Sequence, residues 1–164
     1  MNDTTTPLAF DAENAYLAFE GLWCSGQLSA ADIARLPALG VGTVINLAPP
    51  NASKVLAGEA EQVTALGLNY VQIPVSWDAP SPQQFELFAG VMAAVGHQAV
   101  WLHCARNMRA SAFVYLYRLL VRGEGELQSA WPMSQVWTPN PAWQQWITAV
   151  RSARGAGAAQ LDPR

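Results

Sequence analysis

Four short apolar stretches along the chain alternate with longer segments in which hydrophobic residues recur at helical spacing. Each apolar stretch contains β-branched or aromatic residues, a composition typical of a buried strand. Buried strands that alternate with helices through short connections indicate parallel β–α–β units. We therefore predict an α/β fold in three layers, with a central, mostly parallel sheet of about four to five strands flanked by helices. The expected strands are residues 20–27, 41–47, 69–75 and 99–103.

Helix boundaries are indicated by capping residues and by glycines. Ser29 and Asp32 resemble a capping box, with Asp in place of the usual Glu or Gln. Gly67 and Gly123 each follow a periodic segment, where a glycine commonly ends a helix. The expected helices are residues 29–39, 53–66, 83–95, 110–122 and 124–135, the last kinked near Pro132, followed by a C-terminal helix that contains Trp143, Trp146 and Ile147.

The composition indicates one globular domain. Of the 164 residues, 51% are hydrophobic and 13% are charged, which is enough apolar material for a single core. We expect a flexible N-terminal lead over residues 1–18, one domain over residues 19–152 and a frayed tail over residues 153–164.

Charge and targeting signals exclude several classes of partner. The formal net charge is −3 and Lys54 is the only lysine, so the chain has no basic run suited to nucleic acid or to an anionic membrane surface. No apolar run reaches the roughly 20 residues of a membrane span. The first residues do not resemble a signal peptide, and two cysteines imply no disulfide framework. We therefore expect a cytoplasmic protein.

The chemistry is concentrated in residues 99–111, where a predicted strand passes through a short loop into a helix. Backbone N–H groups of such a loop form an anion-binding nest, and the helix adds the positive end of its dipole. Cys104 lies at the start of this loop, where a thiolate is favoured, and a thiolate is a nucleophile. Arg109 closes the loop, and its guanidinium can donate two hydrogen bonds to a tetrahedral oxyanion. The sequence predicts attack on a phosphoryl or sulfur centre.

His103 and Cys104, followed by four residues and Arg109, resemble the signature of the cysteine-dependent protein tyrosine and dual-specificity phosphatases. The usual loop has five residues between Cys and Arg. The shorter form is similar to a bacterial phosphatase-like branch of unknown function, some members of which are fused to β-lactamase-like hydrolases. Residues 25–28, Ser-Gly-Gln-Leu, also match the start of that branch, and the resemblance extends over about residues 22–147.

The resemblance implies a phosphatase-like domain over residues 19–152, which hydrolyses a phosphate monoester through a cysteinyl-phosphate intermediate. It implies a phosphorylated protein or small molecule as substrate, a phosphate or sulfate ion in the loop, and neither cofactor nor metal. Cys104 would be the nucleophile, Arg109 would hold phosphoryl oxygens, and His103 would support the loop by hydrogen bonding. The implied phosphate-binding loop consists of Ala105, Arg106, Asn107, Met108 and Arg109.

The loop departs from the usual pattern at two positions. It contains no glycine, and Asn107 is its residue most tolerant of positive φ. Ala110 replaces the usual Ser or Thr after the arginine, and Ser111 is a candidate to reach the sulfur instead. Arg106 is either a solvated charge or a contact for a second acidic group on the substrate.

Asp78 is the candidate general acid, because related phosphatases use an aspartate on a separate loop. It is the acidic residue of the loop after the third predicted strand, next to Trp77. The alternative is a solvated loop aspartate or a helix cap. Cys24 is either a small packed residue or a resolving thiol for Cys104.

Two other functions remain open at this point. Rhodanese-like sulfurtransferases also use a loop of Cys, four residues and Arg, and a short loop suits a persulfide. A loop without glycine is also compatible with a pseudo-phosphatase, which would bind an anion without turnover.

Overall fold

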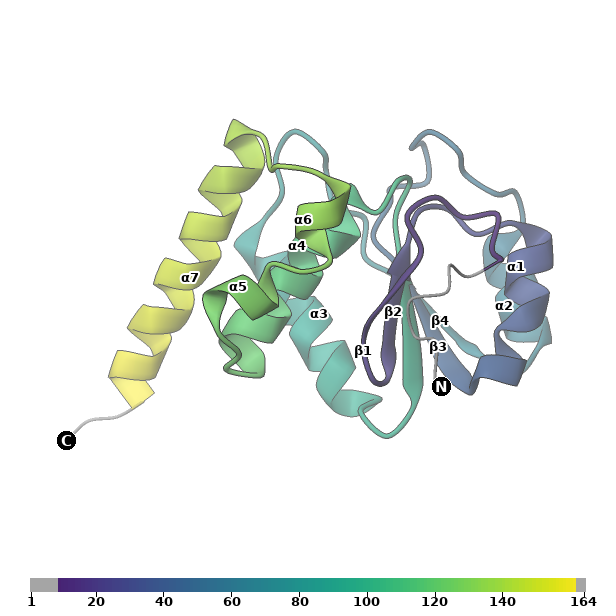
Figure 1. The fold of residues 1–164 in the computed structure, drawn as a ribbon, viewed down its shortest axis with the longest axis horizontal. Coiled ribbons are helices and arrows are strands. Elements are labelled where there is room, and N and C mark those ends of the chain that lie inside the picture. The colour runs from purple at the N-terminus through teal and green to yellow at the C-terminus, as the bar shows by residue number, and fades with distance from the viewer. Residues whose placement is uncertain (1–8, 162–164) are drawn as a thin grey trace.

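The structure is a computed structural model that describes residues 9–161. Its centre is one five-stranded sheet with the strand order β1-β2-β5-β3-β4 (Figure 1). Strands β2, β5, β3 and β4 pair in parallel, and β1 pairs antiparallel with β2. The strands are β1 Tyr16–Phe19, β2 Leu22–Ser25, β3 Val41–Asn46, β4 Asn69–Gln72 and β5 Ala99–His103.

Helices cover both faces of this sheet, which confirms the predicted three-layer α/β fold. Figure 1 shows α1 and α2 on one face and α3 to α7 on the other. Each face has its own buried hydrophobic cluster, one containing Trp101 and Leu28 and a larger one containing Phe85 and Phe113. The helices are α1 Ala30–Arg35, α2 Glu59–Ala65, α3 Pro82–Ala94, α4 Met108–Leu116, α5 Glu126–Ser129, α6 Met133–Val136 and α7 Pro141–Leu161, with a 3-10 turn at Pro37–Leu39 and a π-helical turn at Tyr117–Val121. None of the helices in the described part of the chain combines the length and hydropathy of a membrane span.

Several helix boundaries differ from the prediction. The capping box of Ser29 and Asp32 is present, with both reciprocal hydrogen bonds formed. The helix expected over residues 53–66 begins only at Glu59, because Lys54 and Gly58 adopt positive φ and keep the preceding segment non-helical. The helix expected over residues 124–135 is instead two short helices, α5 and α6.

The two chain ends also differ from the expectation. Residues 1–8 lie outside the described residues, but the rest of the expected lead over residues 1–18 is attached to the domain. The Asp32 carboxylate accepts hydrogen bonds from the backbone N–H groups of Asp11 (2.8 Å) and Ala12 (3.0 Å), and β1 extends the sheet. Within the expected tail over residues 153–164, α7 continues to Leu161, and residues 162–164 are not described.

The sheet topology places the predicted loop at the carboxyl end of the central strand, β5. β5 lies between β2 and β3, so that His103 pairs in register with Ser25 on one side and Asn46 on the other. The loops that follow three parallel strands therefore meet around Cys104. This carboxyl edge is where open α/β sheets bind ligands.

Candidate active site

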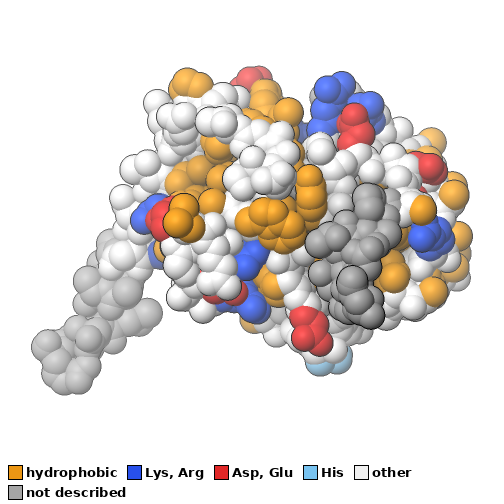
Figure 2. All heavy atoms as spheres, viewed as in Figure 1, with side chains coloured by type: hydrophobic (Ala, Val, Ile, Leu, Met, Phe, Trp, Pro, Cys, Tyr) orange, Lys and Arg blue, Asp and Glu red, His pale blue; other side chains and the backbone are white. Residues whose placement is uncertain are grey.

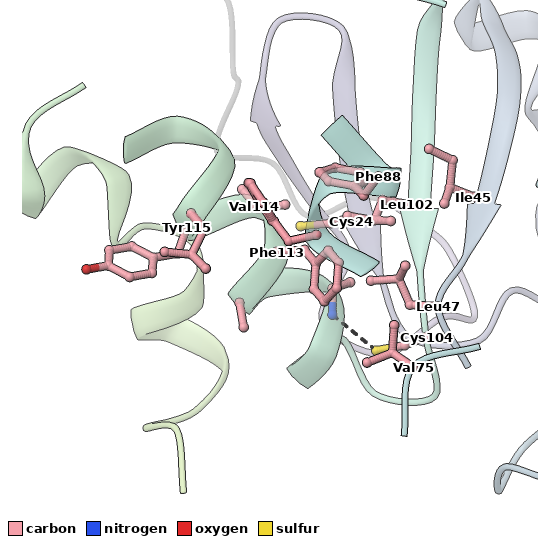
Figure 3. Close-up of a cluster of buried hydrophobic side chains, with 14 of the residues drawn as sticks. Cys24, Ile45, Leu47, Val75, Phe88, Leu102, Cys104, Phe113, Val114 and Tyr115 are labelled. Carbon is pink, nitrogen blue, oxygen red and sulfur yellow. Dashed lines mark hydrogen bonds between the residues drawn. The ribbon is translucent and has the colours of Figure 1, made fainter. Parts of the chain in front are cut away.

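Cys104 lies directly after β5, against the first turn of α4. Its side chain is 1% exposed. The Sγ atom accepts a hydrogen bond from the backbone N–H of Ala110 at 3.4 Å, which is drawn as a dashed line in Figure 3. Figure 3 also shows Leu47 and Val75, which follow β3 and β4, beside the cysteine. The sulfur therefore faces the N-terminus of a helix, and apolar groups shield it on its other side.

The chain turns into α4 at Asn107. This residue has φ of 72°, which is in the left-handed region that glycine usually occupies. The loop has no glycine, and Asn107 adopts this conformation in its place. Asn107 is the N-cap of α4, and its carbonyl oxygen accepts from the N–H of Ser111 at 2.9 Å. The absence of glycine therefore does not prevent the short loop from closing.

A neighbouring segment from the N-terminus holds the outer side of this loop. The side-chain amide of Asn14 donates to the Arg106 carbonyl oxygen at 3.0 Å. In return, the side-chain amide of Asn107 donates to the Asn14 carbonyl oxygen at 2.8 Å. Asn14 also has positive φ, of 54°. These reciprocal bonds fix the loop backbone between Cys104 and α4.

Gly26 brings the end of β2 against the same loop. The N–H of Gln27 donates to the Ala105 carbonyl oxygen at 3.0 Å. A Cβ on Gly26 would lie 2.7 Å from the Ala105 oxygen and 3.1 Å from the Arg106 Cα. Only glycine allows this close approach of two backbones.

Arg109 lies within the first turn of α4, 6% exposed. Among the described residues, no acceptor lies within hydrogen-bonding distance of its buried Nε. The guanidinium carbon lies 5.7 Å from the centre of the Trp77 ring. A buried guanidinium with an unpaired N–H at the side of a pocket is suited to bind an anion.

Trp77 is held in place by a cluster of tryptophans. Its ring centre lies 5.2 Å from that of Trp137 and 6.0 Å from that of Trp143. The indole N–H of Trp143 donates to the Trp77 carbonyl oxygen at 2.9 Å. The loop after β4 is therefore anchored to α7 at the pocket wall.

These groups surround a pocket of about 340 Å³, a size typical of small-molecule sites. Cys104 and Arg109 are part of its lining, which is largely apolar. The lining residues are Ala52, Ser53, Trp77, Cys104, Ala105, Arg106, Met108 and Arg109.

Arg106 lines the pocket, and Figure 2 shows a group of basic side chains at the upper edge of the molecule. Arg106 is 58% exposed, and its Nε lies 3.9 Å from the carboxylate of Glu13. The amine of Lys54 lies 3.8 Å from the same carboxylate. Both are long, solvated contacts, which contribute little to stability and leave the cations accessible.

His103 connects the loop to α2. It is fully buried, its Nδ1 lies 3.2 Å from the Cys104 carbonyl oxygen, and its Nε2 lies 2.5 Å from Oε2 of Glu59. Burial alone would raise the pKa of Glu59. The hydrogen bond and positive charge of His103, with hydrogen bonds from Gln27 and Tyr70, outweigh that effect and lower this pKa.

Two predicted site residues have different surroundings from those expected. Asp78 is exposed and is not among the residues that line the pocket, although its neighbour Trp77 is. The Ser111 hydroxyl donates to the Met108 carbonyl oxygen at 3.1 Å instead of reaching the sulfur, and the Ala110 N–H contacts the sulfur in its place.

Cys24 lies deeper in the core than Cys104, among Val114, Phe113 and Leu102 (Figure 3). Burial raises the pKa of its thiol to about 12. A thiol with this pKa stays protonated at neutral pH and is a poor nucleophile. Of the two interpretations of Cys24, this environment fits a small packed core residue better than a resolving thiol.

The sequence analysis missed two residues of the site. Asn14 falls in the segment expected to be a flexible lead, and Glu59 lies in the helix expected over residues 53–66, without an expected role. No local sequence pattern distinguishes an asparagine that adopts positive φ, as Asn14 does, from other asparagines. The one local signal at Glu59 is the preceding Gly58, since a glycine can mark a helix boundary. Glu59 is the first residue of α2.

Comparisons with known proteins find similar phosphatases. Residues 11–152 match the family described as DSP-PTPase phosphatase fused to NAD+ kinase. A DUF442 phosphatase structure from Shewanella putrefaciens CN-32 is 31% identical, with a TM-score of 0.78 over 88% of this chain and 95% of that one. No curated protein matches the chain.

Two more distant structures share the fold. PTPMT1 in complex with PI(5)P is 15% identical, with a TM-score of 0.73 over 88% of this chain and 99% of that one. A variant of TpbA from P. aeruginosa in complex with pTyr is 18% identical, with a TM-score of 0.64 over 88% of this chain and 90% of that one.

Proposed function

Because the chain belongs to the family of DSP-PTPase phosphatases fused to NAD+ kinase, we propose that it hydrolyses phosphate monoesters through a cysteinyl-phosphate intermediate. The observation that carries this proposal is the pairing of Cys104 and Arg109 in one pocket. The sulfur lies at the N-terminus of α4, and the buried guanidinium that lines the same pocket retains an N–H without an acceptor among residues 9–161. A phosphoryl group placed between them would satisfy both.

The reaction has two displacements at phosphorus. In the first, the Cys104 thiolate forms a sulfur–phosphorus bond while the bond from phosphorus to the leaving oxygen breaks. In the second, water attacks the phosphorus, the sulfur–phosphorus bond breaks, and inorganic phosphate and the thiolate are released. Two steps at a positioned nucleophile replace one slow attack by water.

Arg109 and the helix N-terminus stabilise the charge of the transferring group. The guanidinium can donate two parallel hydrogen bonds to equatorial phosphoryl oxygens, which suits the trigonal transition state. The bonds from Asn14 and Gln27 hold the loop in place before substrate binds. Catalysis of this kind depends on charge stabilisation by groups that are already oriented.

Asp78 is the proposed general acid for the leaving group. It is the acidic residue between β4 and α3, and it follows the pocket-lining Trp77. Its side chain is exposed, so it must turn toward the pocket when substrate binds. Catalytic contacts are often incomplete in a site without substrate.

The proposed substrate is a phosphorylated organic molecule with an apolar or aromatic portion beside the phosphate. Trp77, Met108 and Ala52 contribute apolar lining to the pocket, and Cys104 and Arg109 contribute the thiol and the guanidinium. Relatives of this fold were crystallised with PI(5)P and with pTyr, each of which carries a phosphomonoester group. Phosphate and sulfate ions are expected to occupy the same loop.

The two other candidate functions have less support. The matches reported above are to phosphatases, which does not favour a rhodanese-like sulfurtransferase. The pseudo-phosphatase was suggested by the lack of glycine in the loop, and Asn107 supplies the conformation that glycine would give.

A direct assay separates the three functions. The purified chain is expected to hydrolyse a small aryl phosphate, to be inhibited by vanadate and to lose turnover in the Cys104→Ser variant. It should transfer little sulfur from thiosulfate to cyanide. Sulfur transfer without phosphate hydrolysis would identify a rhodanese-like enzyme, and phosphate binding with neither activity would identify a pseudo-phosphatase.

A further inference from the structure

The two ring nitrogens of the buried His103 both face hydrogen-bond acceptors. Nε2 lies 2.5 Å from Oε2 of Glu59, and Nδ1 lies 3.2 Å from the carbonyl oxygen of Cys104. The side chain of His103 is 0% exposed and that of Glu59 is 5% exposed. Water therefore has little access to either partner, and the contacts within this cluster decide where protons lie.

Glu59 is surrounded by donors, which favours its carboxylate form. Its Oε1 accepts from the side-chain amide of Gln27 at 2.8 Å. Burial raises the pKa of Tyr70 to about 12, so its hydroxyl keeps its proton and can donate to Glu59. The Tyr70 oxygen in turn accepts from the side-chain amide of Asn46 at 3.0 Å. A carboxylate with donors on both oxygens can act only as an acceptor toward His103.

Counting protons then determines the form of the imidazole. A neutral imidazole has one N–H and one lone pair, so one nitrogen would present its lone pair to an oxygen acceptor. Such an unsatisfied, repulsive contact is unfavourable inside a protein. An imidazolium donates to both acceptors at once.

We infer that Glu59 is a positioning residue that holds His103 as an imidazolium, with both ring nitrogens protonated, next to the nucleophile Cys104. The inference rests on the proposed function only in treating Cys104 as the nucleophile. The edge of the ring that carries Nδ1 faces the Cys104 carbonyl group, and the Glu59 carboxylate contacts the opposite edge. The positive end of the ion pair therefore lies on the side of the cysteine, where it favours the thiolate.

Few other ionisable groups act on this pair. Tyr70 stays protonated, and the exposed Glu61 on α2 acts on Tyr70. The groups around the ring are Glu59 from α2, Tyr70 from β4, Cys104 from its own strand, and the neutral Asn46, Ser25 and Gln27 from β3, β2 and the turn after β2.

The first experiment measures the protons on His103 in the unmodified chain by ¹⁵N NMR of the ring nitrogens. The chain has two histidines, and the other, His97, lies in an exposed turn, so its signals can be identified with His97→Gln. Both nitrogens of His103 are expected to be protonated at pH 7. A neutral ring with one protonated nitrogen would overturn the inference, and this result does not depend on how any variant folds.

The second experiment compares Glu59→Gln with Glu61→Gln, which removes the same charge from the same helix without contacting His103. Glu59→Gln is expected to give a neutral His103 ring. Alkylation of Cys104 by iodoacetamide at pH 6 should slow by about tenfold, with its pH–rate profile displaced by about one unit to higher pH. Glu61→Gln should match the unmodified chain, and Glu59→Asp should recover part of the rate.

The outcomes separate this inference from the proposed function. A folded Glu59→Gln variant with the imidazolium and alkylation profile of the unmodified chain would overturn the role of Glu59. If the NMR and alkylation results are as expected but no phosphate ester is hydrolysed, the ion pair stands and the proposed phosphatase activity fails.

Discussion

Asn14 and Asn107, 93 residues apart in the sequence, are joined by a hydrogen bond of 2.8 Å from the side-chain amide of Asn107 to the carbonyl oxygen of Asn14. Asn14 completes the contact by donating its own amide to the Arg106 carbonyl oxygen at 3.0 Å. Both residues have positive φ. The segment before β1 is therefore part of the wall that holds the phosphate-binding loop.

This contact predicts that Asn14→Gly weakens phosphate binding. Glycine keeps the positive φ and the backbone acceptor but removes the donor to Arg106. We expect the inhibition constant for inorganic phosphate to rise by about two- to fivefold, the equivalent of one hydrogen bond. Glu20→Gln is the control, because Glu20 is an exposed residue in the turn after β1 and none of the contacts described above involves it. Equal inhibition constants for Asn14→Gly and the unmodified chain would show that the loop does not depend on Asn14.

Gly26→Ala is expected to lower both the stability and the activity of the chain. The added methyl group would lie 2.7 Å from the Ala105 carbonyl oxygen, so that either β2 or the loop must move. Forced displacements of this kind destabilise by about 1–3 kcal/mol, measurable by urea denaturation. Gly90→Ala is the control, since a Cβ there meets no atom within 4 Å and alanine favours the interior of α3. If both variants unfold at the same urea concentration, the close approach at Gly26 is not required.

Iodoacetamide should label Cys104 much faster than Cys24 at neutral pH. Cys104 lines the pocket, whereas burial raises the pKa of Cys24 to about 12. Cys24 should react only when the pH approaches 12 or when the chain unfolds. Inorganic phosphate should protect Cys104, because it would occupy the same loop. Mass spectrometry of the labelled peptides gives both rates, and comparable rates or a lack of protection would argue against an activated thiolate.

Asp78→Asn tests the proposed general acid. The rate for substrates with poor leaving groups should fall by about 10²–10⁴-fold, and the rate for good leaving groups should change little. The basic limb of the pH–rate profile should also disappear. Asp78 is exposed in this structure, so an unchanged profile would assign the proton to water or to another group.

The sequence was sufficient to predict the fold and the position of the loop because both depend on local patterns. Apolar stretches such as residues 41–47 and 99–103 identify buried strands from their composition. The spacing of Cys104 and Arg109 fixes the loop between a strand and a helix. Asn107, which residue type alone marks as the loop position most tolerant of positive φ, has φ of 72°.

Contacts between distant segments could not be predicted in the same way. Asn14 lies in a polar stretch that gives no sign of docking, and only the folded chain places it beside Arg106. Glu59 has the pattern of an exposed helix residue, yet the first turn of α2 faces His103. The side-chain direction of Ser111 depends on the Met108 carbonyl oxygen one turn earlier, which the spacing from Cys104 does not reveal.

The central claim is that Cys104 becomes covalently phosphorylated during turnover. The most direct measurement is rapid acid quenching of the chain during hydrolysis of an aryl phosphate, followed by mass spectrometry of the peptide that contains Cys104. The account predicts a phosphoryl group on Cys104, which should be lost in Cys104→Ser and persist longer when attack by water is slow. Hydrolysis that proceeds at full rate with no phosphoryl group on Cys104, or that survives in Cys104→Ser, would contradict it.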